Sequence, residues 1–131
     1  MKRVFVFFCF VLLLQSCFFP DRSYRFKFIN NADFPIYVLT DLNAEDERLS
    51  PGSSPQYVDA NYYGYISNHH PWDKVITDSI HLYVIDASNI KLPPRPLSNE
   101  NIETIEDLIL ERITVYNSDV ARPEEFEVVF P

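Results

Sequence analysis

The sequence predicts an all-β fold: a small antiparallel β-sandwich, immunoglobulin-like in outline, with one or two short helical turns near its C-terminal end. Three observations lead to this prediction. Residues 24–29 alternate between apolar and charged side chains, which is typical of a strand with one buried face. Residues 80–85 are apolar on both faces apart from His81, as expected of a central strand. The remaining apolar runs are short and are separated by Asn, Asp and Pro residues that favour turns.

The first two strands are expected at residues 24–29 and 35–40. In the first of them one face carries three aromatic side chains, Tyr24, Phe26 and Phe28. The connecting residues 30–33, Asn-Asn-Ala-Asp, are turn formers. Because the connection is short, we expect the two strands to form a hairpin that opens the domain.

The middle of the chain contains a polar loop at residues 41–55, a short strand at 56–58 and a central strand at 79–86. Asp41, Asn43 and Glu45 match alternate ligand positions of an EF-hand calcium loop. However, Asp46 stands where that loop requires Gly, and Gly52 stands where it requires Glu. A solvated acidic loop is therefore the better interpretation.

The C-terminal third begins with a stiff, extended proline-rich loop at residues 92–97. A short helix is expected within 98–107, with Ser98 as its cap, followed by a strand at 108–116. A second helical turn is expected within 118–125. A closing strand at 126–130 directs three side chains into the core, Phe126, Val128 and Phe130.

The first seventeen residues have the pattern of a bacterial lipoprotein signal. Lys2 and Arg3 precede an apolar run at residues 4–14, which is too short for a comfortable bilayer crossing of about 20 residues. The run ends in Leu14-Gln15-Ser16-Cys17, which resembles a lipobox. We therefore expect cleavage after residue 16 and acyl chains on Cys17. The alternatives are an ordinary secretory signal, in which Cys17 is incidental, and an uncleaved anchor.

The chain then divides into a signal peptide (1–16), a lipidated Cys with a short tether (17–23) and one β-rich domain (24–131). Cleavage removes two basic residues, so 9 of 11 remain against 19 acidic residues and the net charge falls from −8 to −10. Such a charge argues against nucleic acid as a partner. With Cys9 removed and Cys17 acylated, no disulfide can form, so the domain depends on its hydrophobic core.

Several short motifs resemble those of a group of small, uncharacterised lipoproteins of Bacteroidota-type bacteria. They are Asn30-Asn31, the segment 35–38, the strand end 84–87, the segment 109–112 and the closing aromatic strand that stops at Pro131. Arg122-Pro123 departs from the pattern, because it interrupts the group's helical segment. The resemblance implies a lipid-anchored, β-rich domain and supplies no catalytic residues.

Aromatic residues in loop-like surroundings are the first candidate site. Side chains of this type could stack on sugar rings or pack against a partner protein. The better interpretation is that most of them fill the core of the sandwich. The residues are Tyr62, Tyr63, Tyr65 and Trp72.

A second candidate site is the segment that contains His69, His70 and Asp73, residue types that bind metal ions in hydrolases. Adjacent residues of an extended chain point in opposite directions, so a polar aromatic loop is the better interpretation. His81 is more easily explained as a hydrogen-bonded core residue.

Together these observations favour a protein without catalytic activity or cofactor. We expect a binding or assembly module that is held at the membrane by acyl chains on Cys17, with an envelope protein or a glycan as its partner. The outer membrane is the expected location. The alternatives are a glycan-binding surface module and a metal-dependent hydrolase, each using the corresponding candidate residues.

Overall fold

The computed structural model describes residues 23–43, 48–120, 122 and 125–131. The predicted signal, Cys17 and most of the tether lie outside these residues, as do parts of the acidic loop and of the turn expected at 118–125. Within the described ranges, no helix is long and apolar enough to cross a membrane.

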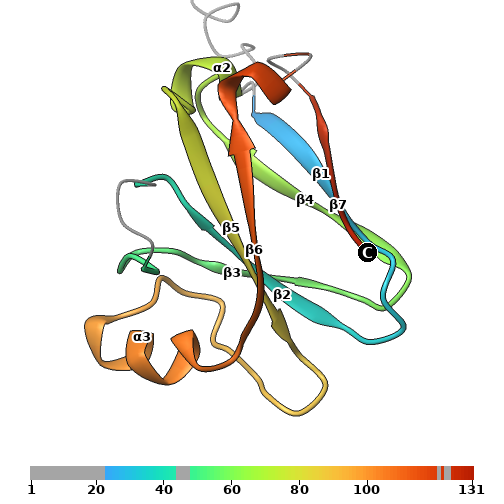
Figure 1. The fold of residues 1–131 in the computed structure, drawn as a ribbon, viewed down its shortest axis with the longest axis vertical. Helices are drawn as coiled ribbons and strands as arrows, with labels where there is room; N and C mark the ends of the chain where they lie inside the picture. Colours follow the sequence, from blue (N-terminus) through green and yellow to red (C-terminus); the bar gives the residue numbers. More distant parts are fainter. Residues whose placement is uncertain (1–22, 44–47, 121, 123–124) are drawn as a thin grey trace, which may run out of the picture.

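Two β-sheets pack face to face, which confirms the predicted all-β sandwich (Figure 1). The three-stranded sheet A has the order β4 (Tyr62–Asn68), β1 (Tyr24–Asn30), β7 (Glu127–Phe130). The four-stranded sheet B has the order β3 (Pro55–Val58), β2 (Ile36–Asp41), β5 (Ser79–Asp86), β6 (Ile109–Tyr116). All neighbouring strands are antiparallel except β1 and β7, which are parallel.

The strand order differs from that of an immunoglobulin domain, in which the first, second, fifth and fourth strands share a sheet. Here the corresponding sheet contains the third, second, fifth and sixth strands. The likeness to immunoglobulin domains is therefore one of outline, with two sheets and seven strands, and it does not extend to the connections.

The main core lies between the two sheets. Phe26 and Phe28 of β1 are fully buried there, facing Leu82 and Val84 of β5. The closing strand adds Phe126, Val128 and Phe130 to the same cluster, as predicted. The Phe26 and Phe126 rings stack with their centroids 4.7 Å apart. Aromatic side chains supply much of the apolar area that holds this small domain together.

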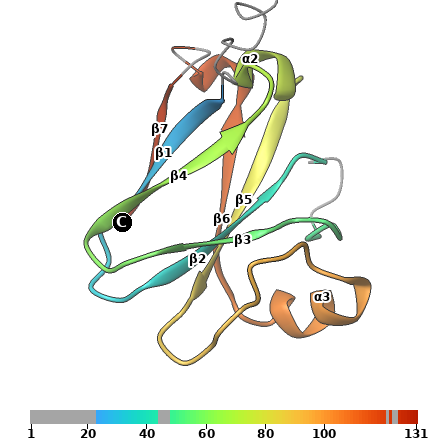
Figure 2. The same cartoon turned by 180° about the vertical axis from the view of Figure 1, so that it is seen from behind.

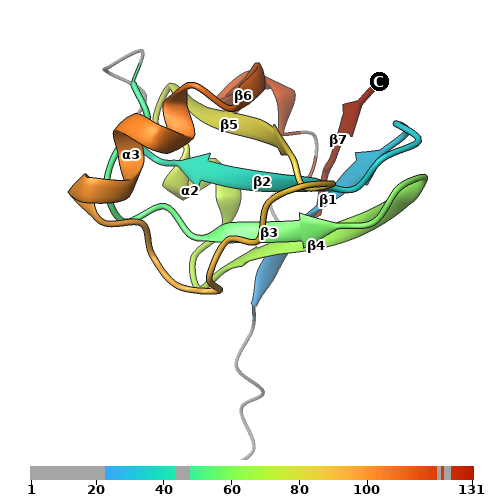
Figure 3. The ribbon, with the colours of Figure 1, turned by 90° about the horizontal axis from the view of Figure 1, so that it is seen from below.

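A second apolar cluster covers the opposite face of sheet B. Its helix, α3 (Asn99–Glu106), packs together with the proline-rich loop against β2 and β5. Figure 3 shows α3 lying over this face, away from sheet A. The buried members are Tyr37, Leu39, Leu49, Tyr83, Ile85, Ala87, Leu97 and Ile105. Strands β2 and β5 are therefore buried on both faces, which explains their continuous apolar sequences, and the helix predicted within 98–107 is confirmed.

The predicted hairpin of the first two strands is wrong. Strand β1 pairs with β4 and β7, whereas β2 pairs with β3 and β5, so the turn crosses from one sheet to the other. The side chain of Asn30 is buried and holds this crossing. Its Nδ2 donates to the carbonyl oxygens of Phe34 (2.9 Å) and Asp59 (3.0 Å), and its Oδ1 accepts from the amide of Ala32 (3.0 Å).

The aromatic segment 62–68 was expected to be a loop and is strand β4. It pairs with β1 along its whole length, with Tyr63 opposite Ile29 and Tyr65 opposite Lys27. Tyr is a good strand former, and Gly64 allows β4 to approach β3, because a Cβ at this position would lie 3.1 Å from Cγ2 of Val58.

Candidate functional site

The outer face of sheet A carries an ordered set of aromatic and basic side chains, which we call the tyrosine face. Its members are Tyr62, Tyr63, Tyr65, Arg25 and Lys27. Strands β1 and β4 lie in front in Figure 2. Across the sheet, Tyr63, Ile29 and Val129 are direct cross-strand neighbours, and so are Tyr65, Lys27 and Glu127. Arg25 and Ser67 form the next pair. The face is therefore apolar at one end and polar at the other.

The rings of the tyrosine face are held by their neighbours. Tyr62 and Tyr63 stack with a centroid separation of 4.8 Å, and Tyr65 meets Tyr63 edge-on at 5.6 Å. The Arg25 guanidinium carbon lies 4.2 Å from the centroid of the Tyr65 ring, and Lys27 Nζ lies 4.6 Å from that of Tyr63. Such cation–π contacts contribute about 0.5–1 kcal/mol each at exposed sites. The side chains of the tyrosine face are thus held in place before any partner binds.

The apolar end of the tyrosine face is open to solvent. Tyr62, Tyr63 and Val129 are 56%, 40% and 50% exposed. Lys27 forms an ion pair with Glu127 at 3.3 Å, whereas Arg25 has no carboxylate partner among the described residues. Among the described residues, this guanidinium therefore contacts the Tyr65 ring and no carboxylate.

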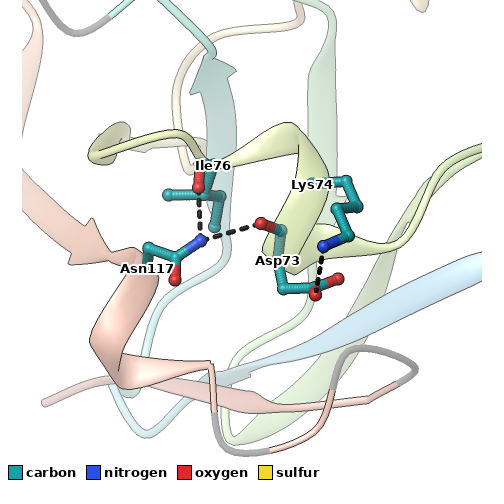
Figure 4. A network of polar contacts seen from close by, with 4 residues as sticks. All are labelled: Asp73, Lys74, Ile76 and Asn117. Atoms are coloured by element: carbon teal, nitrogen blue, oxygen red, sulfur yellow. Dashed lines mark hydrogen bonds and ion pairs between the residues drawn. The ribbon is translucent and has the colours of Figure 1, made fainter.

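Trp72 is not part of this face; it lies in the core, as the favoured interpretation of these aromatic residues expects. It opens the short helix α2 (Trp72–Val75) and is 1% exposed, with its ring edge-on to Phe26 at 4.9 Å. Asn117, in the 3₁₀ turn η1 (Asn117–Asp119), donates to the carbonyl oxygens of Asp73 and Ile76 and ties this helix to the end of β6 (Figure 4). Tertiary packing places the indole in the core.

The histidine segment does not assemble a metal site. In the part of the chain that the structure describes, no three His, Cys, Asp or Glu side chains come close enough to hold an ion. His69 and His70 are exposed, and Asp73 pairs with Lys74 at 3.6 Å (Figure 4). His81 is buried in β5, where its Nδ1 lies 3.2 Å from the Thr114 hydroxyl, as expected of a core histidine.

The acidic loop begins with a carboxylate that has a structural role. Asp41 is buried, and its two oxygens accept hydrogen bonds from the backbone amides of Asn43 (2.9 Å) and Ser50 (2.8 Å). Glu45 and Asp46 of the calcium comparison lie outside the described residues. The Asp41 carboxylate therefore closes the base of the loop.

The pKa of Asp86 is held below its usual value of 3.8 by hydrogen bonds from the side chain and the backbone amide of Ser88. Desolvation raises the pKa of Tyr57 above 10.0, and the neighbouring Asp59 adds to the effect. Asp86 is the last residue of β5, and Tyr57 lies in the edge strand β3. Neither belongs to the tyrosine face.

A cleft of about 410 Å³ opens at the edge of the sandwich, between β3 and β4. We call it the edge cleft. Its polar lining consists of Thr40, Ser54, Gln56, Ser67 and Asn68. Its apolar lining includes Tyr65 and Trp72, so two of the four aromatic residues singled out in the sequence meet here.

Sequence reasoning missed the basic half of the tyrosine face. The alternation of residues 24–29 does place Arg25 and Lys27 on the outer side of β1, but only the pairing with β4 brings them onto the rings. The edge cleft left no signal in the sequence, because its walls come from four separate segments.

Comparison with protein-family models, with curated proteins and with solved structures found no match for this chain.

Proposed function

We propose that this chain is a lipid-anchored binding module of the cell envelope, without catalytic activity, and that its tyrosine face docks on a partner protein. The observation that carries the proposal is the ordered contact between the tyrosine rings and the two basic side chains on an exposed sheet face. Tyr and Arg are enriched among the residues that dominate binding energy at protein interfaces.

The arrangement lowers the cost of binding. Ordering a flexible side chain at an interface costs about 0.5–1.5 kcal/mol, and these rings are already held by stacking and by cation–π contacts. The expected partner surface is complementary to the two ends of the face: apolar where it meets Ile29 and Val129, and acidic where it meets Arg25.

A protein partner fits this face better than a glycan does. Sugars stack on the open faces of aromatic rings. Here Arg25 lies over the ring of Tyr65, Lys27 lies over that of Tyr63, and Tyr62 also stacks on Tyr63. The guanidinium and the ring edges remain available to a carboxylate and to apolar side chains.

The docking test is site-specific photo-crosslinking in cells that express the full chain. We expect a benzophenone amino acid at Tyr63 to yield a discrete crosslinked protein. The same group at Tyr116, which is 50% exposed on sheet B, serves as the matched control and should yield none. Arg25→Glu should abolish the Tyr63 adduct. Equal adducts at both positions, or an adduct that survives Arg25→Glu, would refute docking through this face.

The anchor has its own test. We expect Cys17→Ala to move the protein from the membrane fraction to the soluble fraction and to remove labelling by a radioactive or clickable fatty acid. Two or three acyl chains hold a protein stably, because each buried CH₂ contributes roughly 0.8 kcal/mol. Unchanged fractionation together with unchanged labelling would contradict lipidation at this residue.

A further inference from the structure

A groove lies between α3 and the loop that precedes it, at the end of the sandwich opposite α2 (Figure 1). Residues 90–93 and 97 form the loop wall, and one side of α3 forms the other wall together with Leu108, just beyond the helix. Both walls come from the continuously described stretch 48–120. The volume of about 370 Å³ falls within the roughly 300–1,000 Å³ typical of small-molecule sites. We call this site the helix groove.

The loop wall of the helix groove is anchored at both ends. At one end, the backbone amide of Leu92 donates to the Tyr37 hydroxyl of β2 (3.2 Å). At the other end, Leu97 makes two backbone hydrogen bonds of 3.0 Å, to Gly52 and Ser53. Three prolines between these points restrict the backbone. The groove is therefore formed before any ligand binds, which lowers the cost of binding.

The floor of the helix groove is apolar. Leu97 and Ile105 are buried at its base, Ile90 and Leu92 are half-buried beside them, and Leu108 is 40% exposed at its mouth. A ligand that lays an aliphatic chain on this floor removes apolar area from water. Each buried CH₂ then strengthens binding about fourfold.

One positive charge stands at the rim of the helix groove. Lys91 is exposed and is the only charged side chain among the described residues that line the groove. It forms no ion pair with any described carboxylate. The helical positions on the groove side are 101, 104 and 105, which form one stripe of α3, and none of its three glutamates lies on that stripe. The groove thus joins an apolar floor to a single cation.

We propose that the helix groove binds a fatty acid, whose aliphatic chain lies on the apolar floor and whose carboxylate pairs with the ammonium group of Lys91. The head group carries the single negative charge that one ammonium group neutralises, and Asn101 and Thr104 offer hydrogen bonds beside it. An aliphatic alcohol leaves the Lys91 charge unmatched, and an aliphatic cation is repelled by it. The groove lies on the outer side of sheet B, so its ligand is independent of the partner protein proposed for sheet A (Figure 3).

The test is photo-labelling of the full chain in phosphatidylcholine nanodiscs with a dodecanoic acid that carries a terminal diazirine. We expect peptide mass spectrometry to locate the label within residues 90–108 and unlabelled dodecanoate to compete for it. Dodecanol should compete about tenfold more weakly, because it lacks the charge, and dodecyltrimethylammonium should not compete. Label spread evenly over the chain, equal competition by the cation, or competition by trileucine but not by dodecanoate would overturn the proposal.

Matched variants assign the site to the two walls. Lys91→Glu should weaken competition by dodecanoate about tenfold, because a charge-assisted hydrogen bond is lost. Arg95→Glu makes the same charge change at an exposed position of the same loop that does not line the groove, and it should have no effect.

Thr104→Trp should fill the helix groove and abolish labelling, whereas Glu103→Trp, at an adjacent position outside the lining, should not. Both positions are exposed, as are Lys91 and Arg95, so we expect the circular dichroism of all four variants to be unchanged. Equal effects of Lys91→Glu and Arg95→Glu would overturn the proposal, and so would labelling of residues 90–108 that survives Thr104→Trp.

Discussion

At the scale of single residues, the Asn30 side chain stabilises the turn by which the chain crosses from sheet A to sheet B. Its amide group is fully buried and bonds to three backbone groups, two in the crossing segment and one, Asp59, in the turn between β3 and β4. One side chain thus ties together two of the connections through which the chain changes sheet, β1 to β2 and β3 to β4. Backbone groups buried in such places need partners, because water cannot reach them.

Asn30→Ala should lower the free energy of unfolding by about 3 kcal/mol, because it leaves two carbonyl oxygens and one amide without their partner. Urea denaturation followed by circular dichroism measures this loss. Asn31→Ala is the matched control: the Asn31 side chain is exposed, and only its backbone amide bonds to Phe130 (3.0 Å). A loss below about 1 kcal/mol for Asn30→Ala would contradict the bridging role.

Trp72 shows why the candidate residues could not all be placed from the sequence. Its neighbours His70, Pro71 and Asp73 are typical of an exposed loop, and nothing in the local pattern reveals that the segment folds back over the end of the core. The contacts that bury it come from Phe26 and Phe126, which lie some 50 residues away on either side. Burial of a single residue outside a periodic element is a tertiary property.

At the scale of elements, the strands with a clear period were predictable. Strand β1 alternates because one face is in the core. Residues 80–85 of β5 are apolar on both faces apart from His81, because α3 and sheet A cover the two faces. The β1–β2 hairpin was wrong because its turn residues suit a hairpin and a sheet crossing equally well. Strand β4 was missed because its outward face carries tyrosines where an ordinary sandwich strand carries charged residues.

Strands β3 and β4 approach closely at Gly64 and Val58, which leaves no room for a larger side chain at Gly64. A Cβ at Gly64 already lies 3.1 Å from Val58, so Gly64→Val should overpack this contact and lower the free energy of unfolding by about 2 kcal/mol. In a Val58→Ala background the same substitution should cost clearly less, because the neighbour that it meets is gone. A double-mutant cycle by urea denaturation measures the coupling. Strictly additive losses would show that the contact does not limit this strand.

At the scale of the whole molecule, charge and anchoring act together. If Cys17 carries the lipid, the chain from there to Ser23 can span about 20 Å at most. The end of the sandwich where β1 begins, beside α2, would then face the membrane (Figure 1). The edge cleft lies near this end, whereas α3 would point away from the bilayer.

The net charge of −8 predicts that salt stabilises the fold, because screening weakens the repulsion among 19 acidic residues. Raising NaCl from low to physiological concentration should increase stability by about 1 kcal/mol, or roughly 4 °C in Tm. Glu100→Lys with Glu103→Lys, two exposed positions on α3, should reduce this dependence. An unchanged Tm across the salt range would show that repulsion is not significant.

The parallel pairing of β1 with β7 has a consequence for how the protein is made. Lys27 and Glu127, which are neighbours across this pair, are 100 positions apart in the chain. At translation rates of about 5–20 residues per second, β7 is synthesised roughly 5–20 s after β1. Sheet A cannot be completed during that interval. If the chain is exported, as proposed above, late closure of sheet A would help to keep it in a form that a secretion channel can thread.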